Sequence, residues 1–207
     1  MLKEQFEQNK IGWKKSFLDG FSQDENGDPV PWMTYPAIEF LKNYLTKNHE
    51  IFEFGCGAST LFFSKKVKKV VGLETNPRWL GITQNLLSQA KSDNVEITLM
   101  PDGLENNLYQ NFPKNSGQKF DLIIVDSLKR FECAKNAIAG LKAGGAVILD
   151  DSERKNYKKI FDFFVEKGFE KRDFFGIAPG QLRIKNTTIF FSKDGLPDLS
   201  HWCDKIF

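Results

Sequence analysis

The feature that most constrains the fold of this chain is an alternation of short apolar runs with helical stretches. The runs at 70–73 and 122–125 are continuously hydrophobic, with no polar residue at alternate positions. Strands of this kind are typical of parallel sheets that are covered by helices on both faces. Strands are predicted at 50–54, 69–74, 95–99, 120–125 and 146–150, and helices near 60–66, 78–91, 130–141 and 155–167. The pattern predicts a mainly parallel α/β sheet.

The last part of the chain departs from this rhythm. Residues 171–175 and 187–191 are strand-like, and only a glycine- and proline-containing loop lies between them. Two strands joined by a loop without a crossover helix are antiparallel. We therefore expect seven strands in a Rossmann-like sheet whose last strand is antiparallel.

Three regions are predicted along the chain. Residues 1–31 are polar with scattered aromatic rings and form an N-terminal appendage or lid. Residues 32–192 form the main domain, and 193–207 form a C-terminal tail. A helix is expected to follow Thr34, with Pro36 in its first turn.

Composition excludes several classes of protein. Apolar residues make up 41% and charged residues 27% of the 207 residues, as in an ordinary globular domain. A net charge of +2 gives no electrostatic argument for nucleic acid, and no run approaches the roughly 18 apolar residues of a membrane span. The three cysteines are widely spaced, which is typical of a reducing compartment. We expect a cytoplasmic protein with no nucleic-acid or membrane partner, and the oligomeric state stays open.

The segment 51–60 combines the features of a nucleotide-binding loop. A short apolar strand ends near Glu53, glycines follow at Gly55 and Gly57, and Ser59 stands where it could cap the next helix. Residues without a Cβ let the backbone turn tightly and approach a ligand closely. We expect this loop to contact a nucleotide.

The identity of the nucleotide is less constrained by this loop alone. The third glycine of a dinucleotide fingerprint would fall on Thr60. Glu74, at the end of the second strand, would hold ribose hydroxyls in either kind of site. Three features favour a cofactor other than NAD, namely the position of Glu53, the turn at 101–103 and the antiparallel last strand.

Taken together, these features resemble the class I S-adenosylmethionine-dependent methyltransferases over roughly residues 32–192. Residues 53–59 are similar to the first motif of that family and 72–76 to its ribose-binding strand. Residues 120–126 are similar to its fourth motif, and 141–151 to the turn and fifth strand that follow. Ser59 stands where many members carry glycine, and its small side chain still allows close packing of helix on strand.

The resemblance implies a set of contacts with S-adenosylmethionine. The backbone of the glycine loop would pass under the methionine part, with Glu53 near its amino group. Glu74 would accept from both ribose hydroxyls, and Asp102 from the adenine amino group. The segment 32–35, which precedes a helix N-terminus, would lie against the carboxylate of the cofactor. The implied cofactor-binding residues are Tyr35, Glu53, Gly55, Cys56, Gly57, Ser59, Glu74, Thr75, Asp102, Gly103 and Asp126. Cys56 is interpreted as a small filler of the loop, since no histidine accompanies it.

Acidic residues at two strand ends raise the question of a metal. Asp126 follows the fourth strand, and Asp150 and Asp151 follow the fifth, so all three border the same crevice. The pattern resembles metal-dependent O-methyltransferases of the catechol and macrolide-sugar kinds, which would imply Mg²⁺, with Lys129 as the proton acceptor. The alternative is that Asp126 serves the cofactor or substrate without metal, while Asp151 caps the following helix.

The leading hypothesis is therefore a methyltransferase that uses S-adenosylmethionine on a small molecule, at oxygen, with Asp126 and Lys129 as catalytic residues. One alternative is a catalytically silent module that binds the same cofactor. Another is an NAD-type oxidoreductase, which a parallel last strand would favour. A third is an aminopropyltransferase, whose own glycine-rich loop is not recognisable in this sequence.

Overall fold

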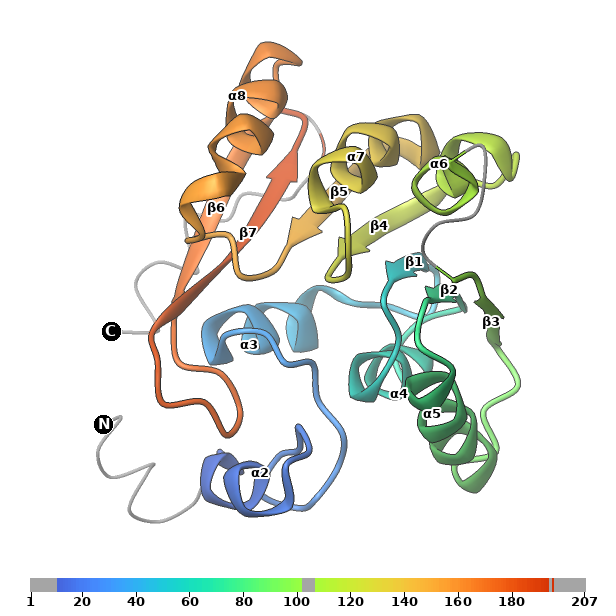
Figure 1. Ribbon diagram of the computed structural model, residues 1–207, viewed down its shortest axis with the longest axis vertical. Coiled ribbons are helices and arrows are strands. Elements are labelled where there is room, and N and C mark those ends of the chain that lie inside the picture. The colour runs from blue at the N-terminus through green and yellow to red at the C-terminus, as the bar shows by residue number, and fades with distance from the viewer. Residues whose placement is uncertain (1–10, 102–106, 194, 196–207) are drawn as a thin grey trace.

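Seven strands form one sheet in a computed structural model that describes residues 11–101, 107–193 and 195. The strand order is β3-β2-β1-β4-β5-β7-β6 (Figure 1). The strands are β1 (Glu50–Phe54), β2 (Lys69–Glu74), β3 (Val95–Leu99), β4 (Phe120–Val125), β5 (Leu141–Leu149), β6 (Glu170–Gly176) and β7 (Lys185–Phe191). All neighbouring pairs from β3 to β5 are parallel, and β7 is antiparallel to both β5 and β6. The predicted fold is confirmed, and the parallel last strand that would favour an oxidoreductase is not found.

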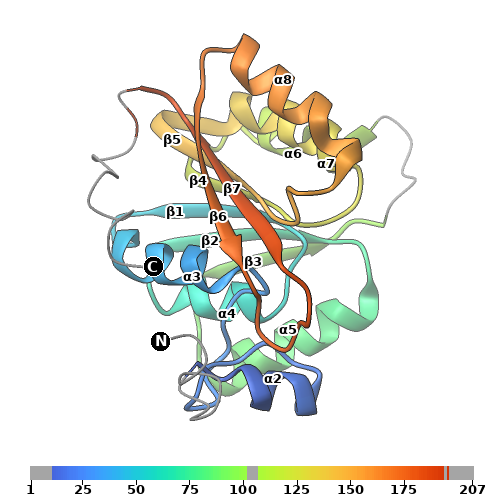
Figure 2. The same cartoon turned by 90° about the vertical axis from the view of Figure 1, so that its left-hand side faces the viewer.

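Helices cover both faces of this sheet. They are α2 (Trp13–Asp19), α3 (Tyr35–Tyr44), α4 (Ala58–Ser64), α5 (Pro77–Gln89), α6 (Leu108–Asn115), α7 (Arg130–Ala137) and α8 (Lys158–Glu166). Figure 2 shows α6, α7 and α8 on one side of the sheet and α3, α4 and α5 on the other. Neighbouring residues of β4 pack on opposite faces of the sheet, since Ile123 belongs to one apolar cluster and Ile124 to the other. This double burial explains the continuous apolar runs of the sequence.

Strand boundaries agree with the sequence pattern for β1 to β4, whereas β6 and β7 are slightly longer than the predicted 171–175 and 187–191, and β5 differs most. The first four strands have the predicted bounds, but β5 begins at Leu141, five residues before the predicted start. Its pairing with β4 shifts register between Phe120 and Leu122, and Gly144 has a positive φ of 76°. An irregularity therefore divides β5 into two paired parts. The glycines at this point interrupt the apolar run, so the sequence pattern did not indicate the earlier start of the strand. Helix α6 was not predicted either.

Two helix starts show how local sequence fixes the chain. Thr34 precedes α3 and accepts a hydrogen bond from the Ala37 amide at 3.4 Å, as predicted for this helix start. The predicted cap at Ser59 is wrong, because Ser59 lies inside the first turn of α4. The residue before that helix is Gly57, whose amide donates to the Thr60 hydroxyl at 3.0 Å.

The N-terminal segment 11–34 is bound to the loop between β6 and β7. The ring nitrogens of two tryptophans in this segment donate to the loop, Trp13 to Gln181 O at 2.9 Å and Trp32 to Pro179 O at 2.8 Å. The first residue of α3 adds a backbone contact, from Tyr35 N to Ile177 O at 3.0 Å. The predicted domain boundaries stay predictions, since residues 1–10 and most of the tail lie outside the described ranges. No helix among the described residues combines the length and the apolar character needed to cross a membrane.

The turn at Gly55 brings the backbone of the glycine loop close to the backbone that follows β4. Gly55 has φ of 91°, and a Cβ at this position would lie 2.7 Å from the carbonyl oxygen of Asp126. We expect Gly55→Ala to lower the free energy of unfolding by about 2–4 kcal/mol, because it adds both strain and overlap with backbone. Urea denaturation measures the change.

The matched control is Gly81→Ala in α5, where an added Cβ meets no atom within 4 Å. That change should raise stability by about 0.5–1 kcal/mol, since alanine favours a helix interior over glycine. Equal stabilities for Gly55→Ala and the wild type would show that the turn tolerates a side chain.

Candidate active site

A cavity of about 280 Å³ lies at the carboxyl ends of β1, β2 and β4. This is the edge where open parallel sheets bind their ligands. The lining combines the glycine loop, two strand-end acids and aromatic rings from the N-terminal segment and α5. The lining residues are Phe21, Ser22, Trp32, Gly55, Cys56, Gly57, Ala58, Ser59, Glu74, Trp79, Asp126 and Ser127.

Six of the predicted cofactor residues are brought together in this lining. They are Gly55, Cys56, Gly57, Ser59, Glu74 and Asp126. A Cβ built on Gly57 would meet no atom of the protein within 4 Å. The loop therefore presents bare backbone, with open space in front of it, to whatever occupies the cavity.

Glu74 is held in one orientation by backbone amides. Its Oε2 accepts from Cys56 N at 2.9 Å, and its Oε1 accepts from the amides of Thr75 and Asn76, both at 2.8 Å. A carboxylate oxygen has two lone pairs, so Oε1 is fully used by the two amides and Oε2 keeps one acceptor position for a ligand hydroxyl. The backbone amide of Thr75 donates to Glu74, and Thr75 is not part of the cavity lining.

Glu53 lies fully buried on β1, beneath the loop and outside the lining. Burial raises the pKa of its carboxyl to about 8; the Ser59 and Thr60 hydroxyls oppose this rise, and the Asp126 and Glu74 carboxylates add to it. Within the described residues, neither carboxyl oxygen accepts a well-formed hydrogen bond. A carboxyl buried in this way is costly to ionise, so a cation bound above it would stabilise its charged form.

Cys56 fills space and is not activated. Burial, followed by the charges of Glu53 and Glu74, raises the pKa of its thiol well above the usual value. A Cβ on Gly72 of β2 would lie 2.4 Å from the Cys56 sulfur, so the glycine of β2 makes room for this side chain. The interpretation of Cys56 as a filler agrees with this geometry.

Aromatic residues form one side of the cavity. Phe21 and Trp32 come from the N-terminal segment, and Trp79 comes from α5. The rings of Trp32 and Trp79 meet edge to face, with centroids 6.4 Å apart. The resemblance implied that the segment of Trp32 lies at the cofactor, whereas Phe21 and Trp79 were not predicted. The contact of Trp32 with Pro179 O in the β6–β7 loop is a tertiary feature that no local pattern indicates.

The remaining cofactor predictions have different outcomes. Tyr35 lies outside the lining, and its ring packs against the apolar cluster on the α3 side of the sheet. Burial, with a contribution from Glu25, raises the pKa of Tyr35 above its usual value, and its hydroxyl has no partner among the described residues. Asp102 and Gly103 fall outside the described ranges and stay predictions.

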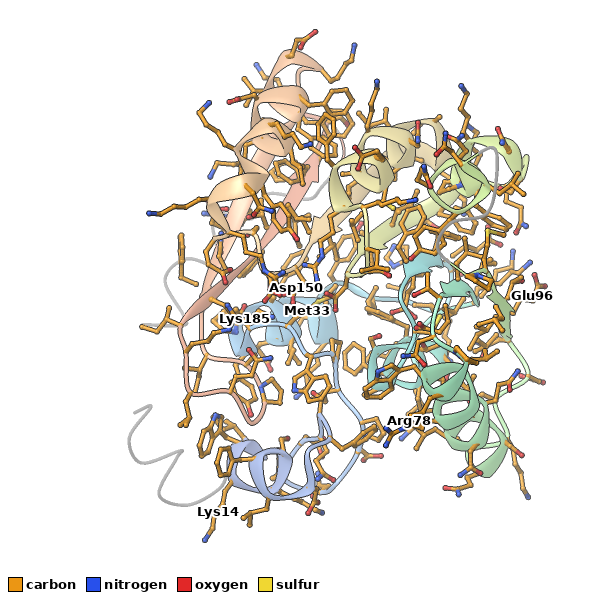
Figure 3. All side chains as sticks on the ribbon, in the orientation of Figure 1. Lys14, Met33, Arg78, Glu96, Asp150 and Lys185 are labelled. Atoms are coloured by element: carbon orange, nitrogen blue, oxygen red, sulfur yellow. The ribbon has the colours of Figure 1, made fainter. Side chains whose placement is uncertain are left out.

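The acids that follow β5 are neutralised by basic side chains. Asp150 is almost fully buried; it pairs with Lys185 and accepts from the Thr187 hydroxyl at 2.7 Å. In Figure 3 the labelled side chains of Asp150 and Lys185 point toward one another. Asp151 binds Lys185 at 2.7 Å and Arg183 at 2.8 Å.

Asp151 is also the residue at which the chain turns out of β5. Its φ is 51°, and its carboxylate pairs with Arg154. Burial alone would raise the pKa of this carboxyl, but Lys185 and the arginines lower it below the usual value. The helix that follows begins only at Lys158. Asp151 is therefore a counter-ion, and the alternative role as a cap of that helix is wrong.

Arg130 rather than Lys129 reaches toward the strand ends. Its guanidinium donates to Asp126 Oδ1 at 2.7 Å and to the carbonyl oxygen of Asp150. Lys129 precedes α7 with φ of 49°, is exposed, and is not part of the cavity lining. The role of Lys129 as a proton acceptor stays a prediction.

The predicted magnesium site at Asp126, Asp150 and Asp151 does not form. Within residues 11–101, 107–193 and 195, no group of three or more His, Cys, Asp or Glu side chains is arranged to hold a metal ion. Ammonium and guanidinium groups already neutralise the three carboxylates, and added positive charge would be repelled. The residues present therefore do not fit a divalent cation.

Comparison with known proteins agrees with this fold. No family model matches the chain. Over 74 residues it is 39% identical to a probable cobalt-precorrin-6B C(15)-methyltransferase (decarboxylating) of Methanobrevibacter smithii. That match covers 33% of this chain and 40% of the relative, so the chain spans less than half of the relative's length.

Solved structures extend the similarity to most of the chain. A precorrin-6y C5,15-methyltransferase from Geobacter metallireducens superposes with a TM-score of 0.60 at 16% identity, over 88% of this chain and 98% of that one. An rRNA methylase from Streptococcus thermophilus gives 0.57 at 15% identity, over 76% and 96%. The O-methyltransferase TomG from Streptomyces achromogenes, in complex with SAM, gives 0.58 at 15%, over 70% and 74%. The chain has the class I methyltransferase fold.

The buried Glu53 predicts a specific pH dependence of stability. With a folded pKa of about 8 against an ordinary 4.5, the native state binds more protons than the unfolded state between these values. Stability therefore falls as pH rises through this window. We expect Glu53→Gln to remove a loss on the order of 3–5 kcal/mol between pH 4.5 and 8, as measured by urea denaturation across that range.

The difference between the wild type and the variant isolates Glu53 from other titrating groups. Glu96→Gln, at an exposed position on β3, is the matched control and should leave the wild-type pH profile unchanged. Parallel pH profiles for Glu53→Gln and the wild type would contradict the assignment.

Proposed function

We propose that this chain binds S-adenosylmethionine in the cavity and transfers its methyl group to a small molecule. The observation that supports this most directly is that the bare backbone of the glycine loop and the fixed Glu74 carboxylate face one cavity. Both lie at the strand ends where a fold of this class binds its ligand. The relatives named as methyltransferases support the same activity.

The residues present fit the parts of this cofactor. Glu74 keeps a free acceptor position on Oε2, which suits a ribose hydroxyl. The open space beside Gly57 admits a ligand against the backbone, and a positively charged amino group above Glu53 would stabilise its ionised carboxylate. When bound, the cofactor supplies an electrophilic methyl group on a sulfonium that is a good leaving group.

The protein itself has to align the acceptor and exclude water. Trp32, Trp79 and Phe21 form an apolar wall that would exclude water from the cavity. Asp126 reaches the same lining while Arg130 fixes its Oδ1, so we propose Asp126 as the group that orients the acceptor. An acceptor hydroxyl needs a base, and Lys129, shortly after the lining residue Ser127, is the proposed one.

The nature of the acceptor is the finer part of the proposal. The names of similar proteins include C-methylation, O-methylation and rRNA, so the fold alone does not select a substrate class. The small net charge of +2 favours a small molecule over RNA. A methyl-transfer assay on small hydroxylated acceptors, with RNA as the comparison, tests this choice. Cofactor binding without turnover on any acceptor would indicate the silent module instead.

Removal of the Glu74 carboxylate should weaken cofactor binding. We expect Glu74→Ala to reduce the affinity for S-adenosylhomocysteine by about 1.5–3 kcal/mol, or roughly 10- to 150-fold, because a charged hydrogen-bonding partner is lost. Isothermal titration calorimetry measures the affinity, and Glu96→Ala at an exposed position serves as the control.

Since Glu74 also binds three backbone amides, its variant is first compared with the wild type by thermal unfolding without ligand. An unchanged affinity in a folded Glu74→Ala protein would remove Glu74 from the site. No binding of S-adenosylhomocysteine by the wild type would refute the proposed function as a whole.

The aromatic wall offers an independent optical test. Because Trp32 and Trp79 line the cavity, S-adenosylhomocysteine should change the tryptophan emission of the protein. Trp79→Phe should remove a large part of that change. Trp13→Phe should not, because Trp13 stacks on Phe17 outside the lining. An identical ligand-induced change in Trp79→Phe and the wild type would place the ligand elsewhere.

A further inference from the structure

Lys185, at the start of β7, holds a buried ammonium group among three oxygen atoms. Its side chain is only 2% exposed. The ammonium contacts the Asp150 carboxylate, Asp151 Oδ1 at 2.7 Å and the carbonyl oxygen of Trp32 at 3.0 Å. An ammonium has three N–H groups, so these three partners satisfy all of them. Figure 3 shows Lys185 directed from β7 toward Asp150.

The chemistry of these partners is that of a cation site. Two carboxylates and a backbone carbonyl are the oxygen ligands that Mg²⁺ and Ca²⁺ take in proteins. Asp150 and Asp151 are also the residues for which the resemblance to metal-dependent enzymes implied a metal. We propose that the Lys185 ammonium is the built-in cation of this acid cluster, which takes the place of a divalent ion.

The surrounding charges agree with a permanent cation at this position. Burial alone would lower the pKa of Lys185, but Asp150 and Asp151 raise it above the usual value, so the group stays charged. Arg154 and Arg183 neutralise the outer side of Asp151. A divalent ion would have to displace the ammonium against these further positive charges.

The same ammonium links the acid cluster to the wall of the cavity. Trp32 lines the cavity, and its carbonyl oxygen is held by Lys185. Two residues later the amide of Thr34 donates to the Thr187 hydroxyl at 3.2 Å, and that hydroxyl donates to Asp150. The segment that carries Trp32 is thus fastened to β7 and to the acids after β5. Lys185 is therefore a positioning residue for this wall.

For the proposed reaction this assignment has one consequence, which rests on the proposed function. The acceptor side of the site would be organised without a metal ion, so methyl transfer should be insensitive to chelators. The role of Lys185 as a cation, by contrast, can be measured on the protein without any cofactor.

The decisive experiment replaces the ammonium and offers other cations. Lys185→Ala leaves the oxygen atoms of Asp150, Asp151 and Trp32 around an empty volume, and its melting temperature should fall well below that of the wild type. Millimolar Ca²⁺ should restore it in a saturable way, by roughly 5–10 °C at a hundredfold excess over the dissociation constant. Methylammonium should act in the same direction, and EDTA should reverse the effect of Ca²⁺.

Two controls separate this from a general effect of salt. Lys185→Met fills the same volume with an apolar chain and should not respond to Ca²⁺. Lys68→Ala removes an exposed lysine that pairs with Glu50, and it too should not respond. The wild type should show no stabilisation by Mg²⁺ or Ca²⁺ and no loss of stability in EDTA.

Saturable stabilisation of the wild type by Mg²⁺ or Ca²⁺ would overturn the proposal, and this result does not require any variant to fold. A folded Lys185→Ala protein that responds to neither Ca²⁺ nor methylammonium would overturn it as well. Binding of S-adenosylhomocysteine provides the link to function, since Ca²⁺ should also restore affinity in Lys185→Ala. If the wild type itself fails to bind that ligand, the proposed function fails, while the melting data still decide the role of Lys185.

Discussion

The compensation of buried carboxylates at one edge of the sheet is the constraint on which the rest of the structure depends. Parallel strands deliver the buried Glu53, Glu74 and Asp150 and the half-buried Asp126 to this edge, where the burial that stabilises the sheet also removes water from the acids. Each acid except Glu53 is stabilised by a different kind of partner. Backbone amides hold Glu74, Arg130 holds Asp126, and the buried lysine of β7 holds Asp150.

The difference among these acids divides the site into two parts. Around the glycine loop, within the described residues, the protein leaves the buried carboxyl of Glu53 without a basic partner and leaves open volume beside Gly57. Around Asp150 and Asp151 it leaves none, because basic side chains bind both carboxylates. A ligand that carries a positive group is therefore favoured at the loop, and a metal ion is disfavoured at the end of β5.

The antiparallel end of the sheet connects these two parts. Placing β7 between β5 and β6 brings its first residue, Lys185, beside the acids that follow β5. The loop before β7 accepts hydrogen bonds from Trp13 and Trp32, so the N-terminal segment closes one side of the cavity. A topological feature at one end of the sheet thus determines both the charge balance and the aromatic wall of the site.

The sequence alone determined the sheet, the glycine loop and the strand-end acids, because apolar runs and glycine spacing are local signals that also specify which edge of a parallel sheet carries the site. It predicted the bounds of β1 to β4 and six lining residues, among them Gly57 and Glu74. The resemblance implied that the segment of Trp32 lies at the cofactor, but the sequence could not predict the contact of Trp32 with Pro179 or of Lys185 with Asp150. The contact of Trp32 with Pro179 joins residues 147 positions apart, and the contact of Lys185 with Asp150 joins residues 35 positions apart. Only the tertiary structure decided that a lysine, and not a metal ion, neutralises the acids, because charge compensation depends on which distant side chains meet after the chain has folded.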